Sequence, residues 1–133
     1  MTQYRISEAA GLLGVSDDTV RRWIAAGTLG VLQDDAGRQV IDGAELAGRA
    51  QEIAVAPSDP SGIASSARNR LVGLVTRIKS DTVMSQVELQ CGPHRIVSLM
   101  STEAVRDLGF EIGSLAVAVV KATMVVVETP KEH

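Results

Sequence analysis

A short segment near the middle of the chain, Ala56-Pro57-Ser58-Asp59-Pro60-Ser61-Gly62, constrains the fold more than any other feature. It contains two prolines and one glycine but no large apolar side chain. Such a composition cannot bury enough surface to fold, so the segment is typical of a linker. The 133 residues suffice for one ordinary domain or two very small ones. Because helical patterns precede the segment and strand patterns follow it, we expect a domain over 1–54, a linker over 55–64, a domain over 65–128 and a tail over 129–133.

The composition restricts the class of protein. Hydrophobic residues make up 45% of the chain, but the only aromatic ones are Tyr4, Trp23 and Phe110, which argues against binding by base stacking. The longest apolar run, 115–120, is too short to span a bilayer, and the N-terminus does not resemble a signal peptide. The single Cys91 precludes an intrachain disulfide. These observations favour a cytoplasmic protein with no membrane partner.

The first domain carries the signals of short helices. Ser7 and Ser16 can cap two helices that end at Gly14 and Gly27. About three residues separate these helices, which is the spacing of a helix-turn-helix. A short hairpin, or wing, is expected around the turn formers at 34–37. An Asp-x-x-Glu capping pattern at 42–45 then opens a third helix. We therefore predict a small, all-α winged helix-turn-helix.

The second domain is rich in Val and Ile, and apolar and polar residues alternate over most of its second run. Ser101 or Thr102 can cap a short helix that Gly109 closes. A small, partly open OB-like barrel is expected, because closure removes exposed sheet edges. The fold class is thus α+β with two domains. The five strands predicted for the barrel cover 71–78, 83–89, 94–100, 115–120 and 124–127.

Residues 65–128 resemble the molybdate-binding Mop domain, the single-unit form of the TOBE family. The resemblance rests on three segments: Ser66-Ala67-Arg68-Asn69, Ser101-Thr102-Glu103-Ala104-Val105 followed by Leu108-Gly109, and Val120-Lys121-Ala122-Thr123. It implies that molybdate, or tungstate, lies between subunits. By resemblance, Ser66, Arg68, Lys121 and the Ala122 backbone belong to one side of the anion, and Ser101 of another chain to the other. The family often has a hydroxyl residue where this chain has Ala104, so a backbone N–H would replace it.

The chemistry of these segments agrees with an oxyanion ligand. A tetrahedral dianion needs several short donors and at most one or two cations, provided that backbone N–H groups converge on it. Arg68 and Lys121 supply charge, and the start of the helix near Ser101 supplies free N–H groups. The predicted oxyanion-binding residues are Ser66, Ala67, Arg68, Ser101, Thr102, Ala104, Lys121, Ala122 and Thr123.

Each segment also has an ordinary structural explanation. Ser66 and Asn69 can simply terminate the linker. Ser101 and Thr102 can be plain helix caps. Lys121 can be a charge that protects a sheet edge. The joint occurrence of the three segments favours the binding site.

Residues 1–50 resemble the small winged helix-turn-helix of the MerR and excisionase group. The resemblance rests on Tyr4-Arg5-Ile6-Ser7-Glu8-Ala9-Ala10, Leu13-Gly14-Val15-Ser16 and Thr19-Val20-Arg21-Arg22-Trp23. It implies that the helix over 17–26 enters the major groove of DNA. The predicted DNA-binding residues are Ser16, Thr19, Arg21, Arg22 and Arg38.

An alternative is that Arg21 and Arg22 only pair with Asp17 and Asp18 one turn earlier. The first 50 residues hold five arginines and seven acidic residues, which departs from the balance of a strong DNA binder.

We find no pattern typical of an enzyme. No Ser-His-Asp or Cys-His set, catalytic carboxylate pair or phosphate-binding glycine loop is evident. Cys91 and His94 are too few for a structural zinc site. We expect no catalytic activity, no metal and no catalytic cofactor.

The leading hypothesis is a molybdate-responsive, DNA-binding transcriptional regulator. Anion binding at a subunit interface would set the spacing of two DNA-reading heads. One alternative is a cytoplasmic molybdate or tungstate store, a molbindin, whose N-terminal domain serves assembly. Another is a DNA-binding protein whose barrel only oligomerises. In each case we expect a homo-oligomer formed through the barrel, a dimer or a trimer of dimers.

Overall fold

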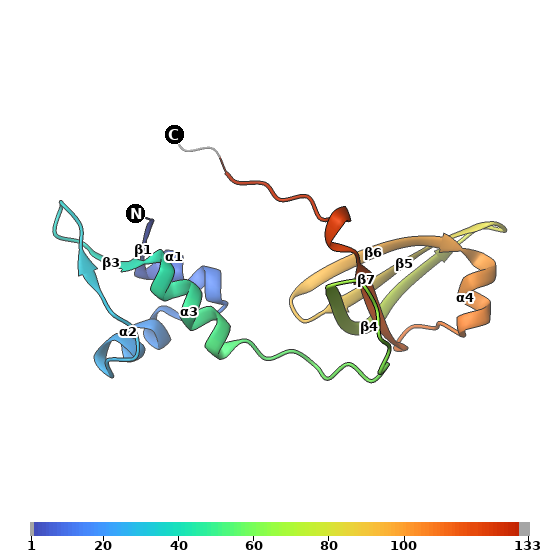
Figure 1. Cartoon of the computed structure of the whole chain (residues 1–133), viewed down its shortest axis with the longest axis horizontal. Coiled ribbons are helices and arrows are strands. Elements are labelled where there is room, and N and C mark those ends of the chain that lie inside the picture. The colour runs from blue at the N-terminus through green and yellow to red at the C-terminus, as the bar shows by residue number, and fades with distance from the viewer. Residues whose placement is uncertain (1, 131–133) are drawn as a thin grey trace. The chain divides into compact units, whose positions relative to one another are not determined.

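The computed structural model describes residues 2–130 (Figure 1). The chain forms two compact units, Met1–Val55 and Ala56–His133. The mixed α+β class predicted from the sequence is confirmed, with four α-helices and a curled sheet. No helix among the described residues is long and apolar enough to cross a membrane.

The first unit combines three helices with a small sheet. The sheet has the strand order β1-β3-β2, so the prediction of an all-α unit is wrong. A three-residue strand is too short to show an alternating pattern in the sequence. Its residue Tyr4 pairs with Ile41 of β3, a contact that forms only when the chain folds. The elements are β1 (Gln3–Arg5), α1 (Ile6–Leu13), α2 (Asp17–Ala25), β2 (Leu32–Gln33), β3 (Gln39–Asp42) and α3 (Gly43–Ile53).

The predicted helix boundaries hold where a side chain or a glycine enforces them. Ser16 caps α2 by accepting a hydrogen bond from the Thr19 N–H at 3.1 Å, and Gly14 ends α1 in the left-handed conformation. Ser7 is not a cap, because α1 begins at Ile6 and its N-cap residue is Arg5, two residues before Ser7. The unit packs around a small buried core of Ala9, Ala10, Val20, Leu29, Ile41 and Leu46.

The second unit is an antiparallel sheet in the order β6-β5-β4-β7. The first half of β4 pairs with β7 and its second half with β5, and a register shift lies between Val75 and Arg77. Such a bulge bends a strand, which lets the sheet curl around its core (Figure 1). The elements are β4 (Asn69–Ser80), β5 (Met84–Cys91), β6 (His94–Ser101), α4 (Thr102–Leu108), β7 (Leu115–Val120) and the 3₁₀ turn η1 (Ala122–Met124).

The predicted fifth strand, 124–127, does not form. Residues 122–124 make the turn η1, and 125–127 are extended without a pairing partner among the described residues. The valines do favour an extended strand conformation, but a β-strand also needs a neighbouring strand to pair with. The sheet therefore has four strands and stays open between β6 and β7.

Candidate functional site

One pocket of the second unit is lined by Ser66, Arg68, Lys121, Ala122 and Thr123 and has a volume of about 270 Å³. It lies where β4 begins and β7 ends, because Asn69 pairs with Val120. The Asn69 side-chain amide also donates to the Val120 carbonyl at 3.1 Å. Antiparallel pairing thus brings together two of the three segments singled out in the sequence.

Backbone geometry adds donors to this pocket. Lys121 is the extended residue before η1, and its carbonyl accepts from the Met124 N–H at 2.9 Å. The N–H groups of Ala122 and Thr123 lie in the first turn, where helical geometry provides no acceptor. Because both residues are exposed and Ala122 is small, an anion can approach these groups.

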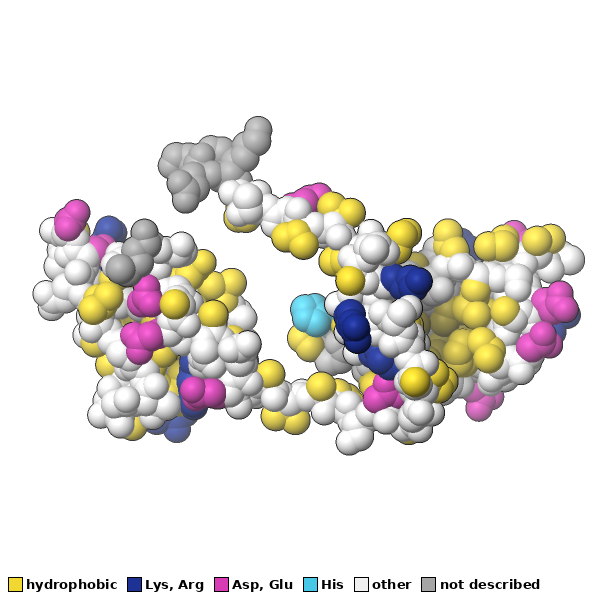
Figure 2. All heavy atoms as spheres, in the orientation of Figure 1, with side chains coloured by type: hydrophobic (Ala, Val, Ile, Leu, Met, Phe, Trp, Pro, Cys, Tyr) yellow, Lys and Arg dark blue, Asp and Glu magenta, His cyan; other side chains and the backbone are white. Residues whose placement is uncertain are grey.

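Two cations and two hydroxyls complete the pocket. Arg68 and Lys121 contribute positive charge, and Ser66 and Thr123 contribute hydroxyl groups. In the space-filling view, Lys and Arg side chains gather on one face of the second unit (Figure 2). Ala67 has a different role: its side chain is buried and its N–H donates to the Ser65 hydroxyl at 3.1 Å. Ala67 was predicted as an oxyanion-binding residue, but it does not line the pocket.

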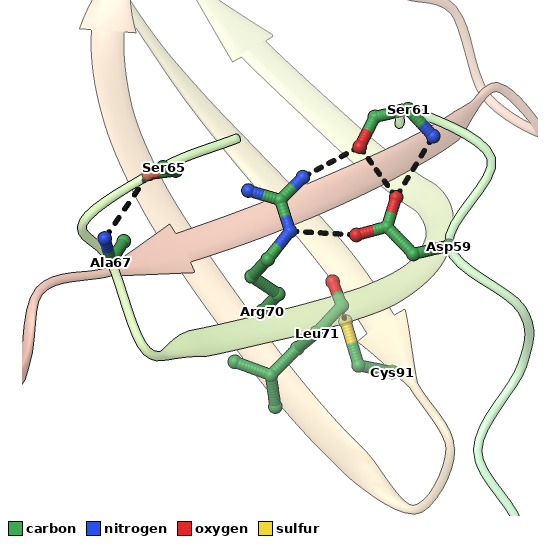
Figure 3. A network of polar contacts seen from close by, with 7 residues as sticks. All are labelled: Asp59, Ser61, Ser65, Ala67, Arg70, Leu71 and Cys91. Carbon is green, nitrogen blue, oxygen red and sulfur yellow. Dashed lines mark hydrogen bonds and ion pairs between the residues drawn. The ribbon is translucent and has the colours of Figure 1, made fainter. Parts of the chain in front are cut away.

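A polar clamp beside the pocket holds part of the predicted linker (Figure 3). The Arg70 guanidinium donates to Asp59 Oδ2 at 2.7 Å and to Ser61 Oγ at 2.6 Å. Ser61 in turn donates its N–H and its O–H to Asp59 Oδ1 at 2.9 and 2.6 Å. The Arg70 hydrogen bond, followed by those of Ser61, holds the pKa of Asp59 well below its usual range.

The sequence alone does not reveal this clamp. Its only signal is an opposite charge eleven residues away, which does not stand out among 13 basic and 16 acidic residues. Because the clamp anchors residues 59–61 to β4, it restricts the position of the chain just before the segment that contributes Ser66 and Arg68 to the pocket.

Asp59→Asn should release the clamped segment at neutral pH. The folded-state pKa of Asp59 lies below the ordinary value, so the contribution of the clamp is present above that ordinary pKa, about 3.9. It is lost as the pH falls through the lower, folded-state pKa. Limited thermolysin digestion at pH 7 should cleave the variant before Ile63 several-fold faster than the wild type, while Asp107→Asn, at an exposed site of the same unit, should not differ. Equal cleavage of all three proteins would contradict the clamp.

The third predicted segment lies at the other end of the sheet. Ser101 pairs with Met84, next to the hairpin at the end of β4, whereas Asn69 begins β4. The 12 residues of β4 correspond to about 35–40 Å of extended strand at 3.2–3.4 Å per residue. One chain therefore does not bring Ser101 and Lys121 to the same small anion.

Two predicted donors of this segment are engaged inside the unit. The Thr102 hydroxyl is buried, donates to the Asp81 carbonyl at 2.9 Å and lies 2.8 Å from Ser85 Oγ. The Thr102 N–H donates to the Val83 carbonyl at 2.8 Å. The Ala104 N–H donates to Ser101 Oγ at 3.0 Å, as the cap of α4. The hydroxyl proton of the exposed Ser101 remains as a donor for an external ligand.

The first unit has a polar surface along α2. Ser16, Asp18, Arg21, Arg22 and Ala25 line an open depression of about 660 Å³. Arg22 donates to Thr19 Oγ1 at 3.0 Å, whereas Arg21 lies 3.5 Å from Asp18. Both partners of that ion pair are well exposed, so it contributes little energy. The alternative pairing of arginines with acids one turn earlier thus applies to Arg21 but not to Arg22.

Arg38 is more fully engaged. It lies in the β2–β3 turn, and its Nε donates to Asp34 Oδ2 at 2.9 Å. The Arg38 backbone N–H, followed by the Ala36 N–H and the Arg38 side chain, lowers the pKa of Asp34. This ion pair reduces the charge that Arg38 presents to a phosphate.

Comparisons with known proteins concern the second unit. The TOBE domain family matches residues 65–127. Molybdenum-pterin-binding protein 2 of Clostridium pasteurianum is 40% identical over 63 residues, which are 47% of this chain and 93% of that protein. The molybdenum transport protein ModE of Herbaspirillum seropedicae is 38% identical over 66 residues, 49% of this chain and 24% of ModE. The solved structure of MopII from Clostridium pasteurianum is 37% identical and covers 50% of this chain and 100% of its own, with a TM-score of 0.47.

Proposed function

Because this chain belongs to the TOBE domain family through residues 65–127, we propose that its second unit binds a tetrahedral oxyanion, molybdate or tungstate. The observation that carries the proposal is the pocket itself. Ser66 and Arg68 come from one segment and Lys121, Ala122 and Thr123 from another, and all five line one pocket. Relatives named for molybdenum binding or transport match the same half of the chain.

The donor set suits a dianion. Arg68 and Lys121 can balance two negative charges, while hydroxyl and N–H groups can surround the oxygens without adding charge. Among the described residues, no cluster of three or more His, Cys, Asp or Glu side chains could hold a metal cation. An anion is therefore the better match to this surface.

The proposed site requires two chains. Ser101 retains a free hydroxyl proton but lies at the opposite end of β4 from Lys121. In a homo-oligomer, Ser101 of one chain can meet the Lys121 pocket of another. Anion binding and assembly are then coupled, so each stabilises the other.

We further propose that the first unit is a winged helix-turn-helix that binds DNA, which would make the protein a molybdate-responsive regulator. The supporting observation is the exposed polar face of α2, where the Arg22 guanidinium donates to Thr19 Oγ1 and forms no ion pair with any described residue. The β2–β3 hairpin is in the position of a wing.

Storage is the second candidate. It is favoured by the ion pairs of Arg21 and Arg38, which reduce the positive charge available to phosphates. A storage protein needs only the oxyanion site and an assembled oligomer, and its first unit would serve assembly.

Two measurements separate these functions. Calorimetric titration of the full chain with molybdate, tungstate and sulfate tests the oxyanion site, and the absence of heat with all three would refute it. Gel shifts with genomic DNA fragments, with and without molybdate, test the regulator. A gel shift of DNA that changes with molybdate supports the regulator. Binding of molybdate without any gel shift supports storage. A gel shift that does not change with molybdate would mean that the second unit serves only for oligomerisation.

Arg22→Ala and Arg21→Ala should each weaken specific DNA binding by about 1–3 kcal/mol if these side chains contact bases. Arg5→Ala removes the same charge from an exposed position outside α2 and should leave specific binding nearly unchanged. Fluorescence anisotropy with a selected DNA fragment at fixed salt measures the difference. Equal affinity of all four proteins, with circular dichroism unchanged, would assign the first unit to assembly instead.

A further inference from the structure

Arg49 on α3 lies over the ring of Trp23 on α2, the helix proposed to contact DNA. The guanidinium carbon is 4.4 Å from the centroid of the indole ring, within the range of a cation–π contact. The side chain of Arg49 is only 19% exposed, and its Nη1 donates to Glu52 Oε2 at 2.9 Å. A largely desolvated cation therefore packs on the only tryptophan in the chain.

Trp23 lies at the boundary between the buried and the exposed faces of α2. Val20 belongs to the core of the first unit, and Ile24 packs against that core. Thr19 is four residues before Trp23 and therefore on the same side of the helix, and its hydroxyl accepts a hydrogen bond from Arg22. Because a rotation of α2 about its axis would move all of these side chains together, the packing of Trp23 determines where Thr19 and Arg22 point.

A second contact joins α3 to the segment that follows α2. The Glu45 carboxylate accepts a hydrogen bond from the Gly30 N–H at 3.3 Å. Glu45 is four residues before Arg49 and so lies one turn earlier on the same face of α3. The Trp23 carbonyl in turn accepts the Thr28 N–H at 2.9 Å. One face of α3 thus contacts both α2 and the chain just after it, and Arg49 makes the contact with α2 itself.

The hydrogen bonding of Arg49 does not suit a purely structural role. Its Nε is buried and forms no hydrogen bond with any described residue. A buried donor without a partner destabilises the folded state, and an unbranched apolar side chain such as methionine can fill a similar space without that cost. The stability of the first unit therefore does not require arginine at this position, whereas an orienting contact with the Trp23 ring does.

We propose that Arg49 is a positioning residue for DNA recognition, an inference that rests on the proposed DNA-binding function of the first unit. Its contact with Trp23 fixes the rotation of α2 and so holds the Thr19 hydroxyl and the Arg22 guanidinium toward the bases. A cation over an aromatic ring favours one arrangement of the two groups, because the attraction depends on where the charge lies over the ring face. Arg49 acts through Trp23 and contacts no phosphate.

Arg49→Met in the full-length chain tests this role. Fluorescence anisotropy with a selected DNA fragment and with a scrambled fragment measures specific and non-specific binding separately. We expect specific binding to weaken about 2- to 30-fold, the range that corresponds to a cation–π contact. Non-specific binding and its salt dependence should stay unchanged, because no phosphate contact is lost.

Two further variants provide the controls. Arg49→Lys keeps a cation that can lie over the ring, so it should recover part of the lost affinity. Arg5→Met removes the same charge from an exposed position outside α2 and should bind like the wild type. Urea unfolding followed by Trp23 fluorescence should place the midpoint of Arg49→Met no lower than that of the wild type, because the buried Nε is gone.

Trp23 fluorescence also reports the contact in the absence of DNA. Arg49→Ala uncovers the ring, so acrylamide should quench Trp23 more efficiently in this variant than in the wild type. Arg5→Ala should be quenched like the wild type. Equal quenching of all three proteins would overturn the contact on which the inference depends.

The binding outcomes separate the positioning role from the proposed function. If wild type binds DNA specifically and Arg49→Met binds equally tightly, the positioning role is overturned and the DNA-binding function stands. If wild type shows no specific binding, the DNA-binding function itself fails and the positioning role fails with it. A parallel loss of specific and non-specific binding with a shallower salt dependence would make Arg49 a phosphate contact instead. A loss of specific binding that a lower urea midpoint accounts for would make its role merely structural.

Discussion

Lys121→Ala should weaken molybdate binding by about 1.5–3 kcal/mol, the range for a hydrogen bond to a charged group, which is roughly a 10- to 150-fold rise in Kd. Lys121 lies between β7 and η1 and lines the pocket together with Ser66 and Arg68. A compact ammonium suits a tetrahedral dianion that also takes hydroxyl and N–H donors, whereas arginine favours planar two-point pairing. Ser66→Ala should cost less, about 0.5–1.5 kcal/mol, because a neutral hydrogen bond is lost.

Lys79→Ala is the control for this measurement. Lys79 lies near the other end of β4, is exposed and does not line the pocket, so its loss changes the net charge equally and leaves every residue of the Lys121 pocket in place. Calorimetric titration of the three variants and wild type at equal ionic strength gives the comparison. Equal weakening by Lys79→Ala and Lys121→Ala would mean that bulk charge, rather than a built site, attracts the anion.

Gly73→Ala should be the most damaging single change in the second unit. Gly73 lies on β4 where β5 and β7 flank it, and an added Cβ would meet the Gln90 carbonyl oxygen and lie 2.6 Å from Cys91 Sγ. The contacted strand, β5, cannot move away without disturbing its ladder with β6 on the other side. Forcing a methyl group into such a packed position costs about 1–3 kcal/mol, and more where backbone has to shift.

Urea unfolding with two probes measures this cost with an internal control. Trp23 is the only tryptophan and lies in the first unit, so its fluorescence reports that unit alone. The far-UV circular dichroism transition of the second unit should move to lower urea, while the Trp23 transition stays in place. Gly48→Ala, on α3 with nothing within 4 Å of the added Cβ, should instead stabilise the first unit by about 0.5–1 kcal/mol. A Gly73→Ala chain as stable as wild type would contradict the close approach of β4 and β5.

Local signals in the sequence predicted much of this fold. The caps at Ser16 and Asp42 are confirmed, as are the glycine ends at Gly14 and Gly109, because each depends on residues within one helical turn. The predicted resemblance of the second unit to the TOBE family is confirmed as well. The predictions that failed depend on partners far away in the chain: β1 forms a strand by pairing with β3, and 124–127 has no pairing partner among residues 2–130.

The residues of the candidate site also fall into those that could be predicted from the sequence and those that could not. Ser66, Arg68, Lys121, Ala122 and Thr123 lie together because the pairing of Asn69 with Val120 brings their segments side by side. The roles of Thr102 and Ala104 could not be read from the sequence, since a hydroxyl or N–H at a helix start looks the same whether its partner is a ligand or the protein. Here Asp81, Val83 and Ser101 are those partners.

The clamp formed by Asp59, Ser61 and Arg70 sets the length of free chain between the two units. From the end of α3 at Ile53 to the anchor at Asp59, only residues 54–58 are unanchored, and the six peptide units involved reach at most about 20 Å. Under the proposed function, a tether this short would limit how far each first unit can move from its own second unit, and so would raise the effective concentration of two first units for neighbouring DNA half-sites. Loss of the clamp would lengthen the tether to residue 68. The effective concentration of the two first units would then fall, although no contact that either unit makes would change.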